Sequence, residues 1–195
     1  MAALGGPPRI LVFAGSIRSG ALSQKLADVA AKELALTEAD VTKISLADHP
    51  LPIYHGDLEA EKGIPENAQK LARLIAAHQG IFIATPEYNN SLPPLLVNAI
   101  DWVSRIRESS GVKYRHRVYA IGSTSDGAFG GARALIDLRK LIASGLRGIV
   151  VPEKIEVPRA HEAFDEVGEF IAEGSSKLLK ALARSLVELA GRLAD

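Results

Sequence analysis

The chain has 195 residues, of which 47% are hydrophobic and 24% are charged, and these proportions are ordinary for one soluble globular domain. Lysine plus arginine and aspartate plus glutamate number 23 each, so the formal net charge is zero and gives no reason to expect nucleic acid or an anionic membrane as a partner. Cysteine is absent, which excludes disulfides, thiolate metal sites and thiol nucleophiles, so any redox chemistry has to come from a bound cofactor.

The sequence predicts neither a membrane span nor a signal peptide. No apolar run approaches the roughly 20 residues that a membrane-spanning helix needs. The segment Met1–Pro8 is short, uncharged and rich in glycine and proline, and we interpret it as a flexible lead into the first strand. We therefore expect one domain over residues 1–195 and a cytoplasmic location.

Strand and helix patterns alternate along the chain. Near-continuous apolar runs predict strands that are buried on both faces, whereas residues 40–45 alternate with polar positions and suit a sheet edge. In chain order, the expected strands are Ile10–Ala14, Asp40–Ser45, Ile81–Thr85, Val118–Gly122 and Gly148–Val151. The helices expected from apolar periodicity and proline starts are Ser23–Ala35, Pro65–Ala77, Pro93–Arg105, Gly131–Ala143 and Val167–Leu193.

This alternation predicts an α/β fold with a five-stranded, mostly parallel sheet and helices on both faces. Right-handed crossovers make it doubly wound, and the number of units suits the strand order 2-1-3-4-5 of flavodoxin-like folds. Ligands bind such a sheet at the carboxyl ends of the strands, where the order reverses between the first and third strands. The segment Leu46–Gly63 is expected to be an irregular loop, either functional or a plain surface excursion.

The loop after the first strand reads GSIRSGALS over residues 15–23 and leads into a helix. Its hydroxyls and amides, the helix dipole and the positive charge of Arg18 favour a phosphate. Two common phosphate loops do not fit, because Ala21 stands where a P-loop needs lysine and Ile17 stands where a Rossmann loop needs glycine. The sequence therefore predicts an anion site, with a helix cap beside a chance arginine as the alternative.

The loops after the third and fourth strands are also polar. The former reads TPEYNNSLPP over residues 85–94, and its stiff, amide-bearing and aromatic turn suits a flavin ring, although an ordinary capped turn has a similar composition. The latter reads STSDGAFGG over residues 123–131, and its small residues let a flat ring approach the main chain, which by itself is a weak signal. Because the three loops converge at one sheet edge, we predict one pocket for an FMN-type flavin.

Four separated motifs resemble the NADPH-dependent FMN reductase family, which includes bacterial quinone, chromate and azo-dye reductases. They are GSIR at 15–18, TPEYN at 85–89, NAIDW at 98–102 and GGAR at 130–133, in the family's order and spacing. The resemblance runs over about residues 10–164. It implies bound FMN, NADPH or NADH as co-substrate, a small-molecule electron acceptor, and a homodimer or homotetramer. Residues 46–63 and the apolar stripe of the last helix are candidate subunit contacts.

The resemblance also implies which residues meet the cofactor. The first loop would hold the phosphate, the second would lie along the ring, and the third would close the other side. The implied cofactor-binding residues are Ser16, Arg18, Ala21, Leu22, Ser23, Pro86, Glu87, Tyr88, Asn89, Ser123 and Asp126. Ala21 and Ser23 depart from the family, which often has serine and asparagine there, so the affinity for FMN is open. Asp126 stands in a loop that commonly contains proline, and it either faces the ring or caps the turn.

The implied reaction is hydride transfer from NAD(P)H to the flavin, followed by two-electron reduction of a quinone, chromate, an azo dye or free flavin in a ping-pong scheme. Because the flavin supplies the chemistry, no catalytic side chain is assigned. No metal site is expected, since His49, His55 and Asp57 share a loop without the spacing of a ligand set. The alternatives are a flavodoxin-like electron carrier, which the neutral charge argues against, and a non-catalytic flavin-binding regulatory protein.

Overall fold

All of the predicted strands are present and form one parallel sheet. The computed structural model describes residues 6–112 and 114–193, so part of the predicted N-terminal lead lies outside the described residues. The strands are β1 (Arg9–Ala14), β2 (Asp40–Lys43), β3 (Gly80–Pro86), β4 (Val118–Thr124) and β5 (Ile149–Val157). Their order is β2-β1-β3-β4-β5, and every neighbouring pair is parallel, which confirms the predicted fold class.

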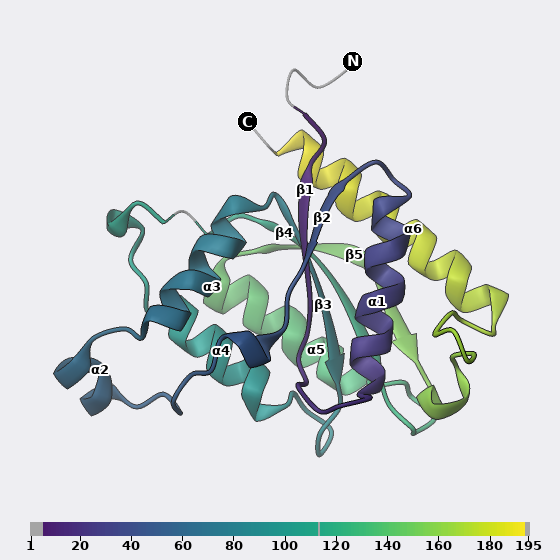
Figure 1. The fold of residues 1–195 in the computed structure, drawn as a ribbon, viewed down its shortest axis with the longest axis horizontal. Coiled ribbons are helices and arrows are strands. Elements are labelled where there is room, and N and C mark those ends of the chain that lie inside the picture. The colour runs from purple at the N-terminus through teal and green to yellow at the C-terminus, as the bar shows by residue number, and fades with distance from the viewer. Residues whose placement is uncertain (1–5, 113, 194–195) are drawn as a thin grey trace.

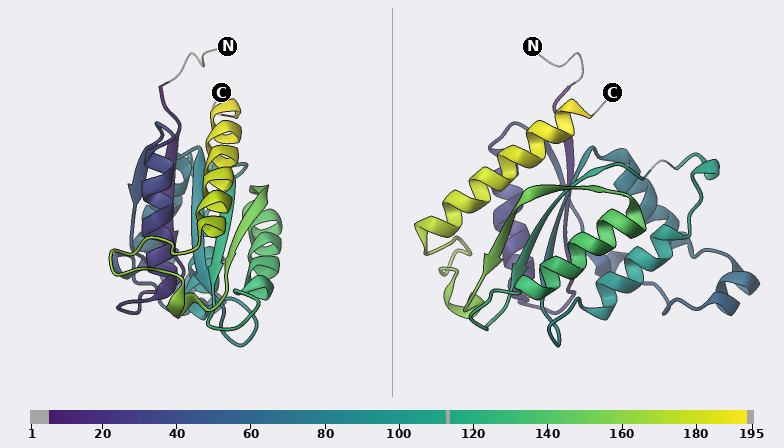
Figure 2. Two further views of the ribbon diagram at one scale, coloured as in Figure 1. Left: turned by 90° about the vertical axis from the view of Figure 1, so that its right-hand side faces the viewer. Right: turned by 180° about the vertical axis from the view of Figure 1, so that it is seen from behind.

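Helices cover both faces of the sheet, and the edge-on view shows the sheet lying between the two helical layers (Figures 1 and 2). The helices are α1 (Leu22–Ala35), α2 (Gly56–Lys62), α3 (Glu66–Ala77), α4 (Pro94–Ser104), α5 (Ala132–Leu141) and α6 (Glu173–Arg192). One core cluster joins the sheet to α1 and α6, and a second joins it to α3, α4 and α5. Five of these helices match predicted ones, with ends that differ by a few residues.

The central strands are continuously apolar because each of them contributes to both core clusters. In β1, Ile10 and Val12 belong to the cluster beneath α1 and α6, whereas Leu11 and Phe13 belong to the opposite cluster. Successive side chains of a strand point to opposite faces, so a strand that is covered on both sides needs apolar residues at every position. The burial of β1, β3 and β4 therefore explains the runs from which these strands were predicted.

The prediction of an irregular loop over Leu46–Gly63 was wrong, because α2 lies within it. No residue of α2 is buried, so the segment lacks the apolar periodicity that reveals a helix. Its attachment is polar instead: the Glu59 carboxylate accepts hydrogen bonds from the Tyr54 hydroxyl at 3.0 Å and from Arg105 Nε at 2.9 Å. The short helix is thus held by the Tyr54 side chain from the preceding loop and by the Arg105 side chain from the end of α4.

The NAIDW motif anchors the same segment to α4. Asn98 Nδ2 and Trp102 Nε1 both donate to the Pro52 carbonyl, at 2.9 and 2.7 Å, and Asn98 Oδ1 accepts from the Tyr54 main-chain N–H at 2.8 Å. Trp102 is fully buried, and its ring meets the Tyr54 ring edge-on. Trp102 therefore has a structural role within this motif.

The C-terminal elements differ from the prediction in extent. Strand β5 continues to Val157, past Pro152 and polar positions, with a register irregularity opposite Tyr119 and Ile121. Helix α6 begins at Glu173 and not at Val167, because a turn precedes it: Gly168 has φ +86°, and Asp165 Oδ1 accepts from the amides of residues 167 and 169. Both errors arose where apolar periodicity fades.

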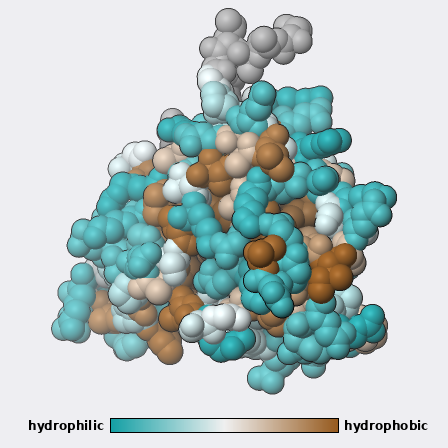
Figure 3. Space-filling view, turned by 45° about the vertical axis from the view of Figure 1, so that its right-hand side comes forward, coloured by the Kyte–Doolittle hydropathy of each residue, from teal (hydrophilic) through white to brown (hydrophobic). Residues whose placement is uncertain are grey.

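The outer side of α1 and α6 is mostly hydrophilic, with hydrophobic residues in small separate patches (Figure 3). In the predicted apolar stripe of the last helix, Leu182 and Leu186 are fully buried in the chain's own core and Leu189 is half-buried, whereas Ile171, Leu178 and Leu193 are exposed. The two ends of the stripe are therefore available as a subunit contact, and its centre is not. Within the described ranges, no helix is both long and apolar enough to cross a membrane.

Candidate functional site

The loops after β1, β3 and β4 meet at the carboxyl edge of the sheet, at the bottom of Figure 1, and enclose a pocket. Its volume is about 330 Å³, which is at the small end of the range for ligand sites. It lies where the strand order reverses, as the topology predicts. The lining residues are Ser16, Arg18, Ala21, Leu22, Ser23, Pro86, Glu87, Tyr88, Thr124, Ser125, Asp126 and Gly127.

Most of the predicted site residues line this pocket, and Asn89 and Ser123 are the exceptions. Ser123 is fully buried, and its hydroxyl donates to the Gly130 carbonyl at 2.6 Å. The prediction ended the fourth strand at Gly122, whereas β4 continues to Thr124, so the pocket wall begins further along the chain. Thr124, Ser125 and Gly127 were missed for this reason; the loop was identified, but its starting point was misplaced.

The first loop has a defined shape of its own. Gly15 N donates to the Ala84 carbonyl at 2.7 Å, which ties the loop to β3. Gln24 Nε2 donates to the Ser16 carbonyl at 2.6 Å, and the Ser16 hydroxyl accepts from Arg18 N at 3.3 Å. These bonds hold the loop against α1 and β3. A ligand would therefore meet a largely formed loop, which lowers the entropic cost of binding.

The start of α1 offers unused donors to the pocket. The N-cap residue Ala21 makes no side-chain cap, and the main-chain amides of Leu22 and Ser23 have no partner among the described residues, whereas Gln24 N donates to the Ala21 carbonyl at 2.9 Å. Ser23 lines the pocket, and its hydroxyl is buried and has no hydrogen-bond partner among the described residues. Ser23 therefore does not cap the helix. A buried hydroxyl without a partner costs roughly 1–3 kcal/mol, and a phosphate oxygen would satisfy it.

Arg18 supplies positive charge beside these donors. Its side chain is exposed and forms no hydrogen bond or ion pair with any residue that the structure describes. A guanidinium in this position can pair with a phosphate group that the helix amides also contact. The residues of the first loop therefore fit the phosphate of FMN in charge and in donor supply.

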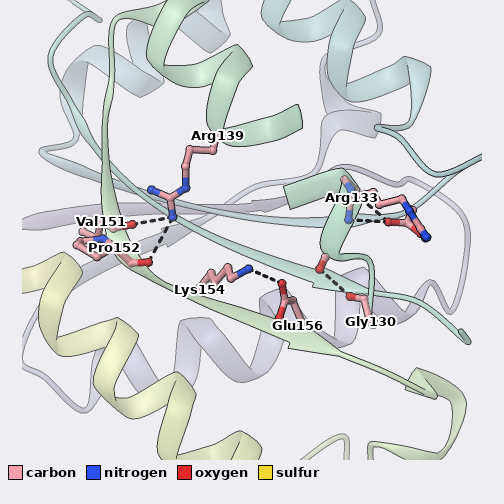
Figure 4. A network of polar contacts seen from close by, with 10 residues as sticks. Gly130, Arg133, Arg139, Val151, Pro152, Lys154 and Glu156 are labelled. Atoms are coloured by element: carbon pink, nitrogen blue, oxygen red, sulfur yellow. Dashed lines mark hydrogen bonds and ion pairs between the residues drawn. The ribbon is translucent and has the colours of Figure 1, made fainter. Parts of the chain in front are cut away.

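The second loop is fastened to the start of α5, where Figure 4 labels Arg133. Glu87 Oε2 accepts from the main-chain amides of Arg133 and Ala134, each at 3.1 Å. The N-cap of α5 is Gly131 at φ +84°, which has no side chain to offer, so Glu87 caps this helix from another loop. Arg133 Nη1 also donates to Asn90 Oδ1 at 3.1 Å. The Glu87 carboxylate is thus engaged by α5 while the residue lines the pocket.

Within this loop the chain makes a tight reversal. Asn89 and Asn90 have φ values of +51° and +62°, and Tyr88 and Ser91 exchange main-chain hydrogen bonds of 3.0 and 2.9 Å. Asparagine tolerates such positive φ better than most residues. The reversal carries Asn89 away from the pocket lining and leaves Tyr88 44% exposed in it. Tyr88 therefore supplies an aromatic surface at the site.

In the third loop, Asp126 lines the pocket and does not cap its own turn. Its Oδ1 accepts from the main-chain N–H of His161 at 3.3 Å and lies 3.0 Å from His161 Nδ1. The turn is capped instead by the Ser125 hydroxyl, which accepts from Gly127 N at 3.2 Å. The hydrogen bond with Asp126 is the main reason that the pKa of His161 is raised above its ordinary value. No sequence pattern connects His161 with residue 126, so this contact could not be predicted from the sequence.

Metal-binding chemistry finds no support in the described ranges, where no group of three or more His, Cys, Asp or Glu side chains is placed to hold an ion. The parallel sheet of order 2-1-3-4-5 and the pocket at its switch point define a flavodoxin-like fold. The chain belongs to the NADPH-dependent FMN reductase family, whose model matches residues 8–162.

Characterised relatives cover most of the chain. A quinone reductase of Escherichia coli strain K12 is 31% identical over 168 residues, which are 81% of this chain and 86% of that protein. An NAD(P)H-dependent FMN reductase of Pseudomonas aeruginosa is 32% identical over 180 residues, 91% of this chain and 92% of that one. The solved structure of FerB, a flavoenzyme NAD(P)H:acceptor oxidoreductase from Paracoccus denitrificans, has a TM-score of 0.75 at 28% identity and covers 95% of this chain and 98% of FerB. The chain is therefore an oxidoreductase enzyme with FMN as its cofactor.

Proposed function

We propose that the pocket at the carboxyl edge of the sheet binds FMN and that the enzyme uses NADPH or NADH to reduce quinones. The observation that carries this proposal is the buried, unpartnered hydroxyl of Ser23 beside the first-turn amides of α1 and the cation of Arg18. These groups match a phosphate, and the rest of the pocket is aromatic and polar, as a flavin ring requires.

Each loop has a distinct part in this proposal. Arg18 and the hydroxyls of Ser16 and Ser23 hold the phosphate, and Leu22 contributes its main-chain amide, whereas Ala21 borders the site with its own amide donating to the Arg18 carbonyl at 3.1 Å. Pro86, Glu87 and Tyr88 form the wall along the ring, with Asn89 shaping the turn behind them. Thr124, Ser125 and Asp126 close the opposite side, and Ser123 braces that loop from behind.

When bound, FMN supplies the two-electron chemistry that connects NAD(P)H with the acceptor. The protein's task is to orient the ring and leave one face open. Tyr88, which is 44% exposed, borders the space where the nicotinamide and then the acceptor would stack. None of the lining side chains is required as an acid, base or nucleophile, so we again assign no catalytic residue.

A binding and turnover experiment tests this proposal. The purified protein is titrated with FMN and, as the matched control, with riboflavin, which has the same ring without the phosphate. We expect FMN to bind at least about tenfold more tightly, since a few charge-assisted hydrogen bonds are worth that much. Equal affinities would contradict the assignment of the first loop as the phosphate site.

Turnover distinguishes the enzyme from its alternatives. The FMN-loaded protein is mixed with NADPH or NADH and a panel of acceptors: a benzoquinone, an azo dye, chromate and free FMN. We expect the quinone to be reduced, with parallel initial-rate lines from a ping-pong scheme. Intersecting lines would contradict that scheme. Flavin binding without NAD(P)H oxidation would favour the electron carrier or the regulatory protein.

We also propose a cytoplasmic homodimer or homotetramer. Both candidate contacts have exposed surface, since α2 within residues 46–63 buries no residue and the two ends of the α6 stripe are exposed. Light scattering after size-exclusion chromatography measures the assembly. A monomer at micromolar concentration would contradict this part of the proposal.

A further inference from the structure

The pocket wall formed by residues 125–127 is held in place by a segment that lies outside the pocket. The segment follows β5, and its residues 157–160 run beside the loop. Three main-chain hydrogen bonds join them: Ser125 N to Val157 O at 3.2 Å, Ala160 N to Ser125 O at 3.1 Å, and Arg159 N to Gly127 O at 3.3 Å. The shape of this wall therefore depends on a distant part of the sequence.

One side-chain contact adds to this main-chain clamp. Asp126 Oδ1 receives the His161 main-chain N–H at 3.3 Å and lies 3.0 Å from His161 Nδ1. On the other side of the imidazole, Nε2 lies 3.1 Å from Glu162 Oε1. In the part of the chain that the structure describes, His161 is the residue whose side chain ties loop 125–127 to its surroundings.

The charges at this contact bear on the cofactor. Asp126 lines a pocket that is otherwise suited to an anionic ligand, so its carboxylate works against that ligand unless it is compensated. His161 lies between Asp126 and Glu162, and the hydrogen bond with Asp126 is the main cause that raises its pKa. Its imidazole thus engages the Asp126 carboxylate on the pocket wall, with Nδ1 3.0 Å from Oδ1.

We propose that His161 is a positioning residue of the flavin pocket: by binding Asp126 it fixes the wall at residues 125–127 and engages the carboxylate that would oppose the cofactor. His161 acts through Asp126 and not by touching the cofactor. The inference rests on the proposed function, namely that the pocket binds FMN.

The test is a double-mutant cycle on the FMN dissociation constant, measured by quenching of flavin fluorescence. We expect His161→Ala to raise the constant about two- to fivefold, because exposed ion pairs have modest energies. In the Asp126→Ala background the same change should have no further effect, since its partner is gone. His161→Gln, whose amide can donate to Asp126, should fall between the wild type and His161→Ala. His116→Asn, at another exposed histidine that lies outside the pocket and outside residues 46–63, is the matched control and should change nothing.

The outcomes separate this inference from the proposed function. An unchanged constant in His161→Ala, or an equal loss in both backgrounds, would overturn the positioning role, because a purely structural effect of His161 would not need Asp126. A wild-type protein that binds no FMN would overturn the proposed function and this inference with it. The melting temperature of each flavin-free variant verifies that it is folded.

Discussion

At the pocket, a buried polar group without a hydrogen-bond partner lowers the stability of the ligand-free fold and is available to a ligand. The Ser23 hydroxyl is the clearest case, because it is fully buried and lacks a partner among the described residues. Native proteins rarely retain such a group unless it serves a ligand or an ordered water. At the first turn of α1, the proposed contact with a phosphate would satisfy this hydroxyl.

We therefore expect Ser23→Ala to have opposite effects on folding and on binding. Removing the unsatisfied hydroxyl should leave the flavin-free protein as stable as the wild type or more so, whereas the dissociation constant of FMN should rise about tenfold or more, because a hydrogen bond to a charged phosphate is lost. Urea unfolding and flavin titration measure the two quantities. Ser19→Ala, in the exposed part of the same loop, is the control. A destabilised variant with unchanged FMN affinity would refute this role.

His161 gives a pH-dependent prediction at the same scale. Since its pKa in the folded state is raised, its contribution to stability is fully present below the ordinary value of 6.5 and is lost as the pH rises through the raised pKa. Asp126→Asn should bring the pKa of His161 back toward 6.5, and Glu162→Gln should lower it less, because the hydrogen bond with Asp126 is the largest cause. An NMR titration of the imidazole measures both. No change in Asp126→Asn would contradict the pairing.

At the scale of elements, the helices owe part of their placement to residues outside them. Helix α5 has a glycine at its N-cap, and Glu87 from the β3–α4 connection accepts its first amides. Helix α2 buries no residue and is held through Glu59. The Glu87 contact joins a pocket loop to the helical layer, so this loop and the start of α5 are ordered together.

Glu87→Ala should therefore loosen the start of α5. We expect a loss of about 1 kcal/mol in the free energy of unfolding, as for other lost helix caps, and faster hydrogen exchange at the amides of Arg133 and Ala134. Glu87→Gln keeps an oxygen acceptor and should lose less. If exchange at these two amides is the same in wild type and Glu87→Ala, the cap does not stabilise the helix in solution.

At the scale of the whole molecule, the pocket joins three loops that are far apart in sequence and belong to one sheet edge. A ligand that binds all three loops binds only the folded state, so it stabilises the fold by mass action. Neither helical layer forms the pocket alone, since its lining comes from the connections between β1 and α1, between β3 and α4, and between β4 and α5.

FMN at a concentration 100 times its dissociation constant should stabilise the protein by about 2.7 kcal/mol. For a chain of this size, that corresponds to a rise in melting temperature of roughly 5–10 °C. Riboflavin at the same concentration should give a smaller rise, because it lacks the phosphate. Thermal denaturation followed by circular dichroism measures both shifts, and equal shifts would argue against the phosphate site in the first loop.

The sequence by itself determined the sheet and the place of the site. Buried parallel strands need apolar residues at every position, so β1, β3 and β4 can be predicted from continuous apolar runs in the sequence. The order of the strands then locates the pocket at the switch point of the sheet. The residues of the first loop were also predictable. Those that line the pocket lie within residues 16–23, a short stretch that directly connects β1 with α1 and includes its first turn.

Tertiary structure decided what depends on contacts between distant segments. The pairing of Asp126 with His161 joins two loops that are separated by β5, and the capping of α5 by Glu87 joins two connections. Neither contact leaves a periodic or local pattern in the chain. The polar attachment of α2 escaped prediction for the same reason, because hydrophobic periodicity reports burial within an element and is silent about hydrogen bonds between elements.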